Sequence, residues 1–173
     1  ATRDLCEVML ADSAHIQEKD AEFLTRHRKS AVEPLYALRD VSTMLTQMAP
    51  HRYHERFEVV PGVHATFSDA GHILGSASIV LEWEEGGRRR RLGFSGDIGR
   101  SGLPIIRDPE PLTDVDWLLM ESTYGNRDHT SVEGARDDLA RIVTETVARG
   151  GRVLIPAFAV GRTQELVYDL HQL

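Results

Sequence analysis

The apolar residues of this chain recur with two periods, one typical of helices and the other of strands. Helical spacing appears over about 2–27 and again over about 40–48. Four further segments have the alternation and residue content of strands: 56–60, 63–69, 77–85 and 89–96. Pro61-Gly62 separates the first two and Gly86-Gly87 the last two, so the pattern predicts two hairpins.

The second half of the chain alternates short apolar runs with helical patterns. The runs at 116–120 and 152–156 are short enough for buried strands. Between them, an apolar stripe predicts a helix that Ser131 caps and Gly150-Gly151 ends. A last helix is expected over 161–173. Hairpins followed by strand–helix alternation predict an α/β sandwich, in which helices cover a mainly antiparallel or mixed sheet.

Three residues that often bind metals stand at the ends of predicted strands. His72 follows strand 63–69, Asp97 follows strand 89–96, and Glu121 follows the run at 116–120. Ligand sites gather at strand ends because rigid strands hold the first loop residues in place. A histidine nitrogen with carboxylate oxygens suits a metal cation. A residue of this kind, taken alone, is more often an ordinary loop or capping residue than a metal ligand. Because all three stand at strand ends, a metal site becomes about as well supported as that ordinary interpretation.

Composition narrows the function classes. With 41% hydrophobic and 27% charged residues, the chain of 173 residues has the composition of a globular protein, and it has no apolar run long enough to span a membrane. Its net charge of −7 argues against a module that holds nucleic acid by charge alone, so RNA or DNA contacts would need local patches or metal ions. The single cysteine, Cys6, excludes an internal disulfide and fits a cytoplasmic protein.

Other polar clusters have two interpretations each. For His51 and His54, exposed loop histidines are favoured over a metal site. For the run 88–91 of four arginines, a solvated sheet edge is favoured over an RNA-contacting patch. At Gly161-Arg162-Thr163, a plain helix start is favoured over phosphate binding by backbone N–H groups.

Five stretches resemble the β-CASP family of metallo-β-lactamases, in the family's order and approximate spacing. DAGHILGSAS and FSGDIGR are similar to its third and fourth metal-ligand motifs. MESTYGNRDH is similar to its acidic motif A, and IPAFAVGRTQEL to the opening strand and helix of its inserted β-CASP domain. The opening segment ATRDLCEVMLADSAHIQEKDAEF is similar to the helix after the family's His-rich second motif.

The resemblance implies a zinc-dependent phosphodiesterase that cleaves RNA in processing or decay, with two zinc ions in the complete enzyme. It implies that His72 binds one ion, that Asp97 bridges both, and that Glu121 orients a histidine that protonates the leaving oxygen. His129, close to motif A, is not expected to act directly. The candidate substrate contacts are Ser122, Thr123, Tyr124 and Arg162.

The implied fold is a metallo-β-lactamase-type αββα sandwich, present in part over 1–125, with the start of a β-CASP domain over 126–173. Both ends of the chain read as helix interiors, so we expect a piece of a longer protein. It contains no His-x-His-x-Asp-His motif, and the resemblance supplies only two primary ligands. We therefore expect the piece to be inactive alone.

Two other functions are kept as alternatives: a β-CASP nuclease that acts on DNA, and a non-catalytic scaffold. Intact His72, Asp97 and Glu121 argue against the scaffold. The expected partner is RNA, and DNA is the alternative. No association with a membrane is expected, and the chain could form a homodimer.

Overall fold

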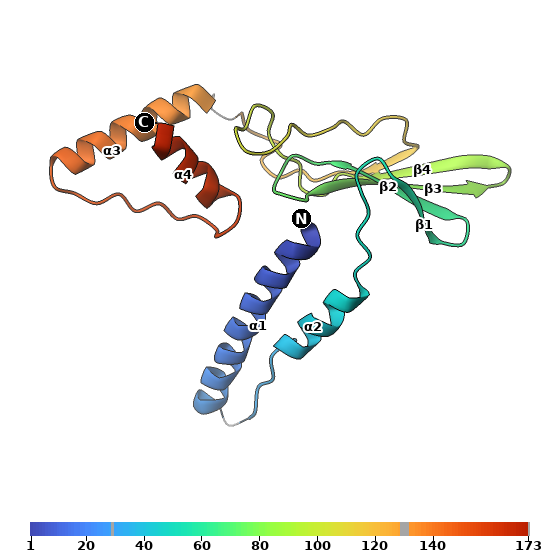
Figure 1. Ribbon diagram of the computed structural model, residues 1–173, viewed down its shortest axis with the longest axis horizontal. Helices are drawn as coiled ribbons and strands as arrows, with labels where there is room; N and C mark the ends of the chain where they lie inside the picture. Colours follow the sequence, from blue (N-terminus) through green and yellow to red (C-terminus); the bar gives the residue numbers. More distant parts are fainter. Residues whose placement is uncertain (29, 129–131, 173) are drawn as a thin grey trace. The chain divides into compact units, whose positions relative to one another are not determined.

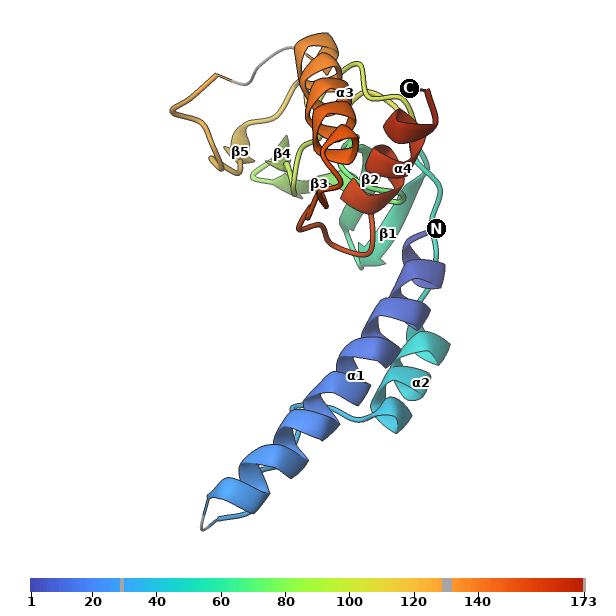
Figure 2. The same ribbon diagram turned by 90° about the vertical axis from the view of Figure 1, so that its left-hand side faces the viewer.

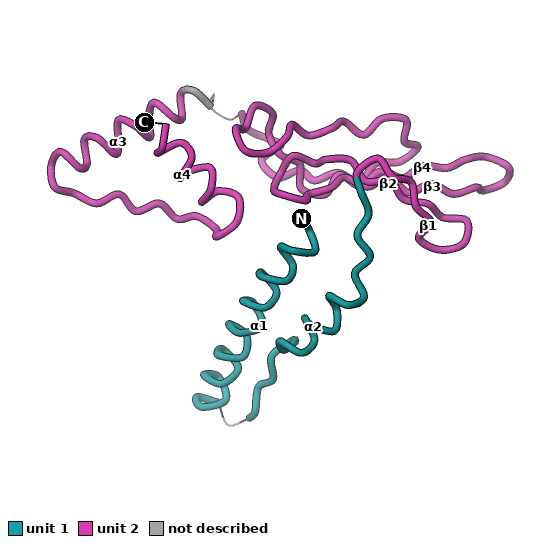
Figure 3. The backbone as a smooth tube through the Cα atoms, viewed as in Figure 1, with its two compact units in different colours: residues 1–52 teal, residues 53–173 magenta. Residues whose placement is uncertain are grey.

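The computed structural model describes residues 1–28, 30–128 and 132–172 (Figure 1, Figure 2). These residues divide into two compact units, Ala1–Arg52 and Tyr53–Leu173 (Figure 3). The predicted cap Ser131 and the histidine His129 lie outside the described residues.

The first unit is a pair of antiparallel helices, α1 (Thr2–His27) and α2 (Leu38–Gln47) (Figure 1). Its buried apolar residues are Ala14 and Ala21 on α1 and Val41 on α2, and small side chains let two helix backbones approach closely. The Ala37 N–H donates to the Asp40 carboxylate at 2.8 Å, which satisfies a free donor where α2 begins. Both predicted helices are confirmed, with α2 beginning two residues earlier than expected.

The second unit is built on a five-stranded sheet in the order β1-β2-β3-β4-β5. The first four strands form an antiparallel meander, and β5 lies parallel to β4. Their bounds are Arg56–Val60, Val63–Asp69, Ala77–Glu85, Arg88–Phe94 and Trp117–Leu119. Gly86 and Gly87 both have positive φ, +57° and +73°, as a tight two-residue hairpin turn requires. The predicted hairpins and the mixed α/β class are confirmed.

The strand register sorts the side chains onto two faces of the sheet. One face is apolar: Phe57 and Phe67 meet edge to face at 5.1 Å, and Trp83 stacks on Trp117 at 6.0 Å. The other face is largely polar, and Ser78 and Glu82 are buried on it. This period-2 pattern follows from the alternation of Cβ directions along a strand.

Two helices complete the second unit, α3 (Val132–Ala148) and α4 (Arg162–Gln172). Arg136 of α3 and Asp169 of α4 form an ion pair at 2.8 Å. None of the described helices has the length and hydropathy needed to cross a membrane.

Two predictions about apolar runs are wrong. The run at 116–120 contains strand β5, but Trp117, Leu118 and Leu119 are 48%, 47% and 55% exposed rather than buried. Among the described strands, β5 is the last of the sheet and pairs with β4 alone. The described run at 152–156 forms no strand, and its Leu154 is 89% exposed. Apolar residues alone do not make this run a strand, because the N–H and C=O groups of a strand must form hydrogen bonds with a neighbouring strand.

The interpretation of the arginine run as a solvated edge is confirmed in part. β5 pairs with β4 only at Leu92, Gly93 and Phe94, so the stretch 88–90 lies on a part of β4 that β5 does not cover. Arg88 and Arg89 are exposed, whereas Arg90 and Arg91 are half-buried. Arg90 lies over the ring of Trp117, 5.6 Å from its centroid.

Candidate active site

The sheet topology gathers the three predicted site residues at one end of the sheet. β2 and β4 both run antiparallel to β3, and β5 runs parallel to β4. The C-terminal ends of β2, β4 and β5 therefore point the same way, and the loops that follow them carry His72, Asp97 and Glu121. The juxtaposition that the sequence suggested is thus present in the fold.

Hydrogen bonds tie these three loops together. The Gly99 N–H donates to the Ala70 carbonyl at 2.7 Å, which joins the Asp97 loop to the His72 loop. The Ile98 N–H donates to the Glu121 carboxylate at 2.5 Å. The Glu121 N–H in turn donates to Ser95 Oγ at 3.0 Å. Each loop is therefore held by at least one of the others.

The His72 loop is also ordered from within. Ser76 Oγ accepts hydrogen bonds from the N–H groups of His72 at 3.0 Å and Ile73 at 3.3 Å. Asp69 Oδ1 accepts from the Gly71 N–H at 2.9 Å, which is an Asx-type turn. The Tyr53 hydroxyl donates to the Ser76 carbonyl at 2.7 Å. Burial and the charge of Asp69 raise the pKa of Tyr53, so the phenol stays protonated and keeps this donor.

Close backbone packing at the site depends on glycine. Gly71 has φ +62°, and a Cβ there would lie 2.6 Å from the backbone nitrogen of Pro109. A Cβ on Gly99 would overlap the carbonyl group of Gly71. The Glu110 N–H donates to the Asp69 carbonyl at 2.8 Å, so the segment around Pro109 is also fastened to the His72 loop.

Glu121 is the electrostatic centre of this arrangement. The hydrogen bond from the Ile98 N–H, a second from the Thr123 side chain and the nearby His72 lower the pKa of the Glu121 carboxyl, against a smaller opposing effect of burial. The carboxylate is therefore ionised near neutral pH. His72 and Asp97 are exposed, and Glu121 is half-buried.

The donor types suit a zinc ion, but their number falls short. His72 offers an imidazole nitrogen and Asp97 a carboxylate, which are normal zinc ligands. Within the described residues, no group of three or more His, Cys, Asp or Glu side chains is placed to hold a metal. A zinc site needs at least three protein ligands, so these residues form part of a site at most.

The candidate substrate contacts lie around the Glu121 loop and at the start of α4. Ser122, Thr123 and Tyr124 enter a turn in which the Gly125 N–H donates to the Ser122 carbonyl at 3.0 Å. Tyr124 has φ 55° and is 58% exposed, and the Arg127 guanidinium lies 5.4 Å from the centroid of its ring.

The segment at the start of α4 lies against the His72 loop. Arg162, its first residue, pairs with Glu165 at 3.3 Å. The preceding Gly161 lies against this loop, because a Cβ there would be 3.1 Å from Ile73 Cγ2.

The two loop histidines differ from each other. His54 is exposed, as expected, and its Nε2 lies 3.3 Å from a carboxylate oxygen of Glu110. His51 is half-buried, contrary to the expectation that both would be exposed.

Three residues that organise the site carried no assigned role in the sequence. Ser76 and Ser95 act as hydrogen-bond acceptors for the loop backbone, and Tyr53 donates from outside the motifs. Ser76 follows the Asp-x-Gly turn by five residues, which is a usable local signal. Tyr53 has no such signal, because its partner is 23 residues away.

The chain is similar to several curated proteins, although no family model matches it. Ribonuclease TTHA0252 of Thermus thermophilus is 32% identical over 171 residues, covering 99% of this chain and 35% of that protein. The transcription termination factor FttA of Methanocaldococcus jannaschii is 34% identical over 177 residues, covering 99% and 26%. An RNase J-like protein of the same organism is 33% identical over 156 residues, covering 86% and 35%. The chain thus spans about a quarter to a third of the length of these relatives.

The similarity runs through nearly the whole chain, and therefore through all three loops of the site. The chain belongs to the β-CASP metallo-β-lactamase family. This confirms the resemblance found in the motifs. Two of these relatives are named as a ribonuclease or as RNase J-like, and the third as a transcription termination factor.

Proposed function

We propose that this β-CASP chain is part of a zinc-dependent phosphodiesterase that cleaves RNA in processing or decay. The observation that carries the proposal is the convergence of His72, Asp97 and Glu121 at one end of the sheet. The ribonuclease names of relatives at about a third identity support it.

In this proposal His72 and Asp97 contribute ligands to a pair of zinc ions, and the rest of the protein supplies the others. Two such cations, when bound, lower the pKa of a bridging water and offset negative charge on the phosphate. Asp97 has two carboxylate oxygens, which suits a bridge between two ions. Because the chain's own ligands are too few, we propose that the 173 residues alone bind zinc weakly and do not cleave RNA.

Glu121 has a second role within the proposal, beyond orienting a histidine that protonates the leaving oxygen. Its carboxylate accepts the Ile98 N–H directly after Asp97. The bond therefore sets the backbone from which the Asp97 side chain projects. Glu121 is thus proposed as a positioning residue for Asp97. Ser122, Thr123, Tyr124 and Arg162 remain the proposed substrate contacts.

The fold and setting follow the family. We propose that 1–125 contributes to a metallo-β-lactamase-type αββα sandwich, and that 126–173 begins the β-CASP domain. The single cysteine of the chain supports a cytoplasmic location.

The test is Asp97→Ala in the complete protein, with exposed Asp12→Ala as the matched control. We expect Asp97→Ala to abolish cleavage of a labelled RNA and to lower the zinc content, while circular dichroism and the melting temperature stay near those of the control. Matched RNA and DNA oligonucleotides distinguish the RNA enzyme from the DNA-acting alternative. A folded Asp97→Ala variant that cleaves RNA normally and retains its zinc would refute the assignment.

A further inference from the structure

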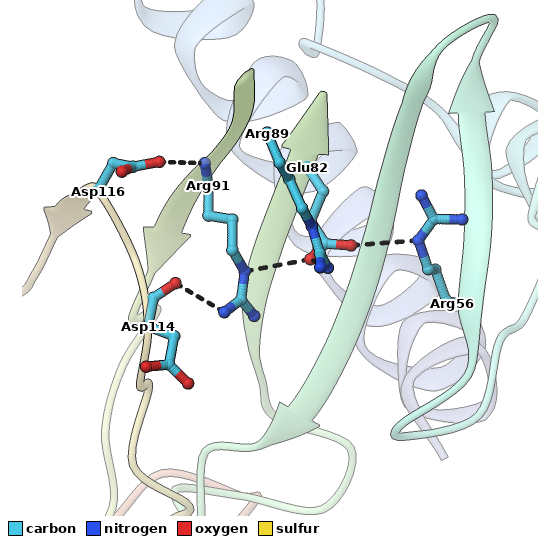
Figure 4. Close-up of polar contacts among 6 residues, drawn as sticks. All are labelled: Arg56, Glu82, Arg89, Arg91, Asp114 and Asp116. Atoms are coloured by element: carbon cyan, nitrogen blue, oxygen red, sulfur yellow. Dashed lines mark hydrogen bonds and ion pairs between the residues drawn. The ribbon is translucent and has the colours of Figure 1, made fainter. Parts of the chain in front are cut away.

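Three arginines converge on one buried carboxylate on the polar face of the sheet (Figure 4). Glu82 of β3 is only 4% exposed. Arg56 of β1 donates from Nε to Glu82 Oε1 at 3.1 Å. Arg89 of β4 donates to Oε2, and Arg91 Nε lies 3.1 Å from the same oxygen. We call Arg56, Arg89, Arg91 and Glu82 the arginine cluster.

The arginine cluster has an excess of positive charge. Arginine is always protonated in proteins, so the three guanidinium groups carry three positive charges. Burial is the largest single influence and raises the pKa of the Glu82 carboxyl, but hydrogen bonds from Arg89 and Arg56 and the charges of Arg89 and Arg91 together lower it below its ordinary value. One carboxylate therefore faces three cations. A structural ion pair with Glu82 needs only one guanidinium group. The other two add repulsion among the positive charges, and a bound anion would reduce this repulsion.

The cluster borders a hollow of about 270 Å³ on this face of the sheet. Glu82 is the only carboxylate among the described residues that line it. Thr66 and Ser68 of β2 add hydroxyl groups to the lining. The hollow therefore offers guanidinium and hydroxyl donors, and its described lining carries a net charge of +2. Glu84, which the register places opposite Arg89 on the same face of the sheet, lies outside that lining.

The guanidinium groups combine rigidity with access. Arg91 is 27% exposed, and its Nη1 donates to the Asp114 carbonyl at 2.6 Å, which fixes its position (Figure 4). Its backbone N–H donates to the Asp116 carboxylate at 2.7 Å. The side chains of Arg56 and Arg89 are 53% and 63% exposed. Because both arginines are hydrogen-bonded to Glu82, their side chains are already ordered, and binding an anion costs little further side-chain entropy.

We propose that the arginine cluster binds a backbone phosphate of the RNA substrate, an inference that rests on the proposed function. Guanidinium groups match phosphate oxygens in pairs, and the cluster's excess of two charges suits a polyanion. In a chain with net charge −7, this local positive surface is the kind of patch that RNA binding needs. The sequence favours a solvated edge for the arginine run, and in the fold two of its four residues, Arg89 and Arg91, line the hollow.

The position of the hollow fits this role. From Ser68 at its lining, β2 reaches its last residue, Asp69, and leads into the His72 loop. Along β3, Glu82 and Ser78 are four residues apart, or roughly 13 Å at about 3.3 Å per residue. An RNA strand held at the arginine cluster would therefore be close enough to reach the end of the sheet that carries the candidate active site.

The test measures binding of single-stranded RNA to the complete protein, in an Asp97→Ala background that prevents cleavage. The variant is Arg56→Ala combined with Arg89→Ala. The control is Arg88→Ala, an exposed arginine that the register places on the opposite face of β4. We expect the double variant to bind RNA roughly tenfold more weakly or worse, and its log–log salt slope to fall by about 0.7 for each phosphate group that is no longer neutralised. The control should bind like the parent.

Further measurements distinguish an arginine cluster that binds phosphate from one that only stabilises the fold. Glu82→Gln removes the one negative charge, so a folded variant should bind RNA more tightly if the hollow receives phosphate. Equal RNA affinity in the double variant, the control and the parent would overturn the proposal. The proposal would also be overturned if the double variant lost binding of inorganic phosphate but bound RNA as the parent does. The ligand of the arginine cluster would then be free phosphate. If wild-type protein cleaves RNA in these cases, the proposed function stands; if it neither binds nor cleaves RNA, the proposed function itself fails.

Discussion

Replacing Gly99 with alanine would place a methyl group where the carbonyl of Gly71 now stands. Two loops of the candidate active site meet there, backbone against backbone. The Gly99 N–H also donates to the Ala70 carbonyl at 2.7 Å, so movement that relieves the overlap breaks this bond. The displacement would reach Ile98 and Asp97, which directly precede Gly99.

The expected cost follows from two contributions. Forcing an extra carbon into a packed site costs about 1–3 kcal/mol. Breaking a backbone hydrogen bond adds about 0.5–1.5 kcal/mol. We therefore expect Gly99→Ala to lower the free energy of unfolding by about 1.5–4.5 kcal/mol. A shift of about 1 Å at a reacting group can lower a rate by about 100-fold, so RNA cleavage by the complete protein should fall by that order.

The matched control is Gly102→Ala, three residues further along the same loop. Gly102 has φ +80° and open space around it. Alanine there should therefore lower the free energy of unfolding only by the strain of the left-handed backbone, about 1–2 kcal/mol. Urea denaturation gives the free energies of unfolding, and a labelled-RNA assay gives the cleavage rates. If Gly99→Ala and Gly102→Ala lose stability and activity equally, the close backbone approach is not what holds the site.

Two further predictions concern the hydrogen bonds around Glu121. Because the folded-state pKa of Glu121 is lowered, its ionisation contributes stability above its ordinary value of 4.5, and this contribution is lost as the pH falls through the folded pKa. Glu121→Gln should therefore lose stability at pH 7 and show a weaker acid dependence below 4.5; an unchanged acid limb in urea titrations would contradict this. Ser95→Ala removes the acceptor of the Glu121 N–H at a buried position and should cost about 1–3 kcal/mol in thermal or urea unfolding. Exposed Ser101→Ala, the control, should change little, and equal values for both serines would show that the bond is dispensable.

The local elements could be predicted because their signals are local. Gly86-Gly87 supplies the two positive φ angles of a tight turn, and alternation over 63–69 and 77–85 specifies which residues share a face. His72, Asp97 and Glu121 could be recognised because each closely follows a strand. Their family motifs then indicated the chemistry to expect of them.

Long-range contacts decided the rest. The apolar runs at 116–120 and 152–156 read alike, yet only the first forms a strand, because β4 offers it a pairing edge. The arginine run indicated positive charge but not its partner. Arg56 and Glu82 are 26 residues apart, and the register across β1, β2 and β3 is what brings them together.

The sequence alone thus determined the helices, the hairpins and the three strand ends that carry candidate chemistry, since turn residues and periodicity act over a few residues. Tertiary structure alone decided that Gly99 packs on Gly71, that Ser95 and Tyr53 brace the loops, and that one buried carboxylate gathers three arginines. Those features depend on which strand ends lie side by side, and strand pairing is set by the cooperative packing of the whole sheet.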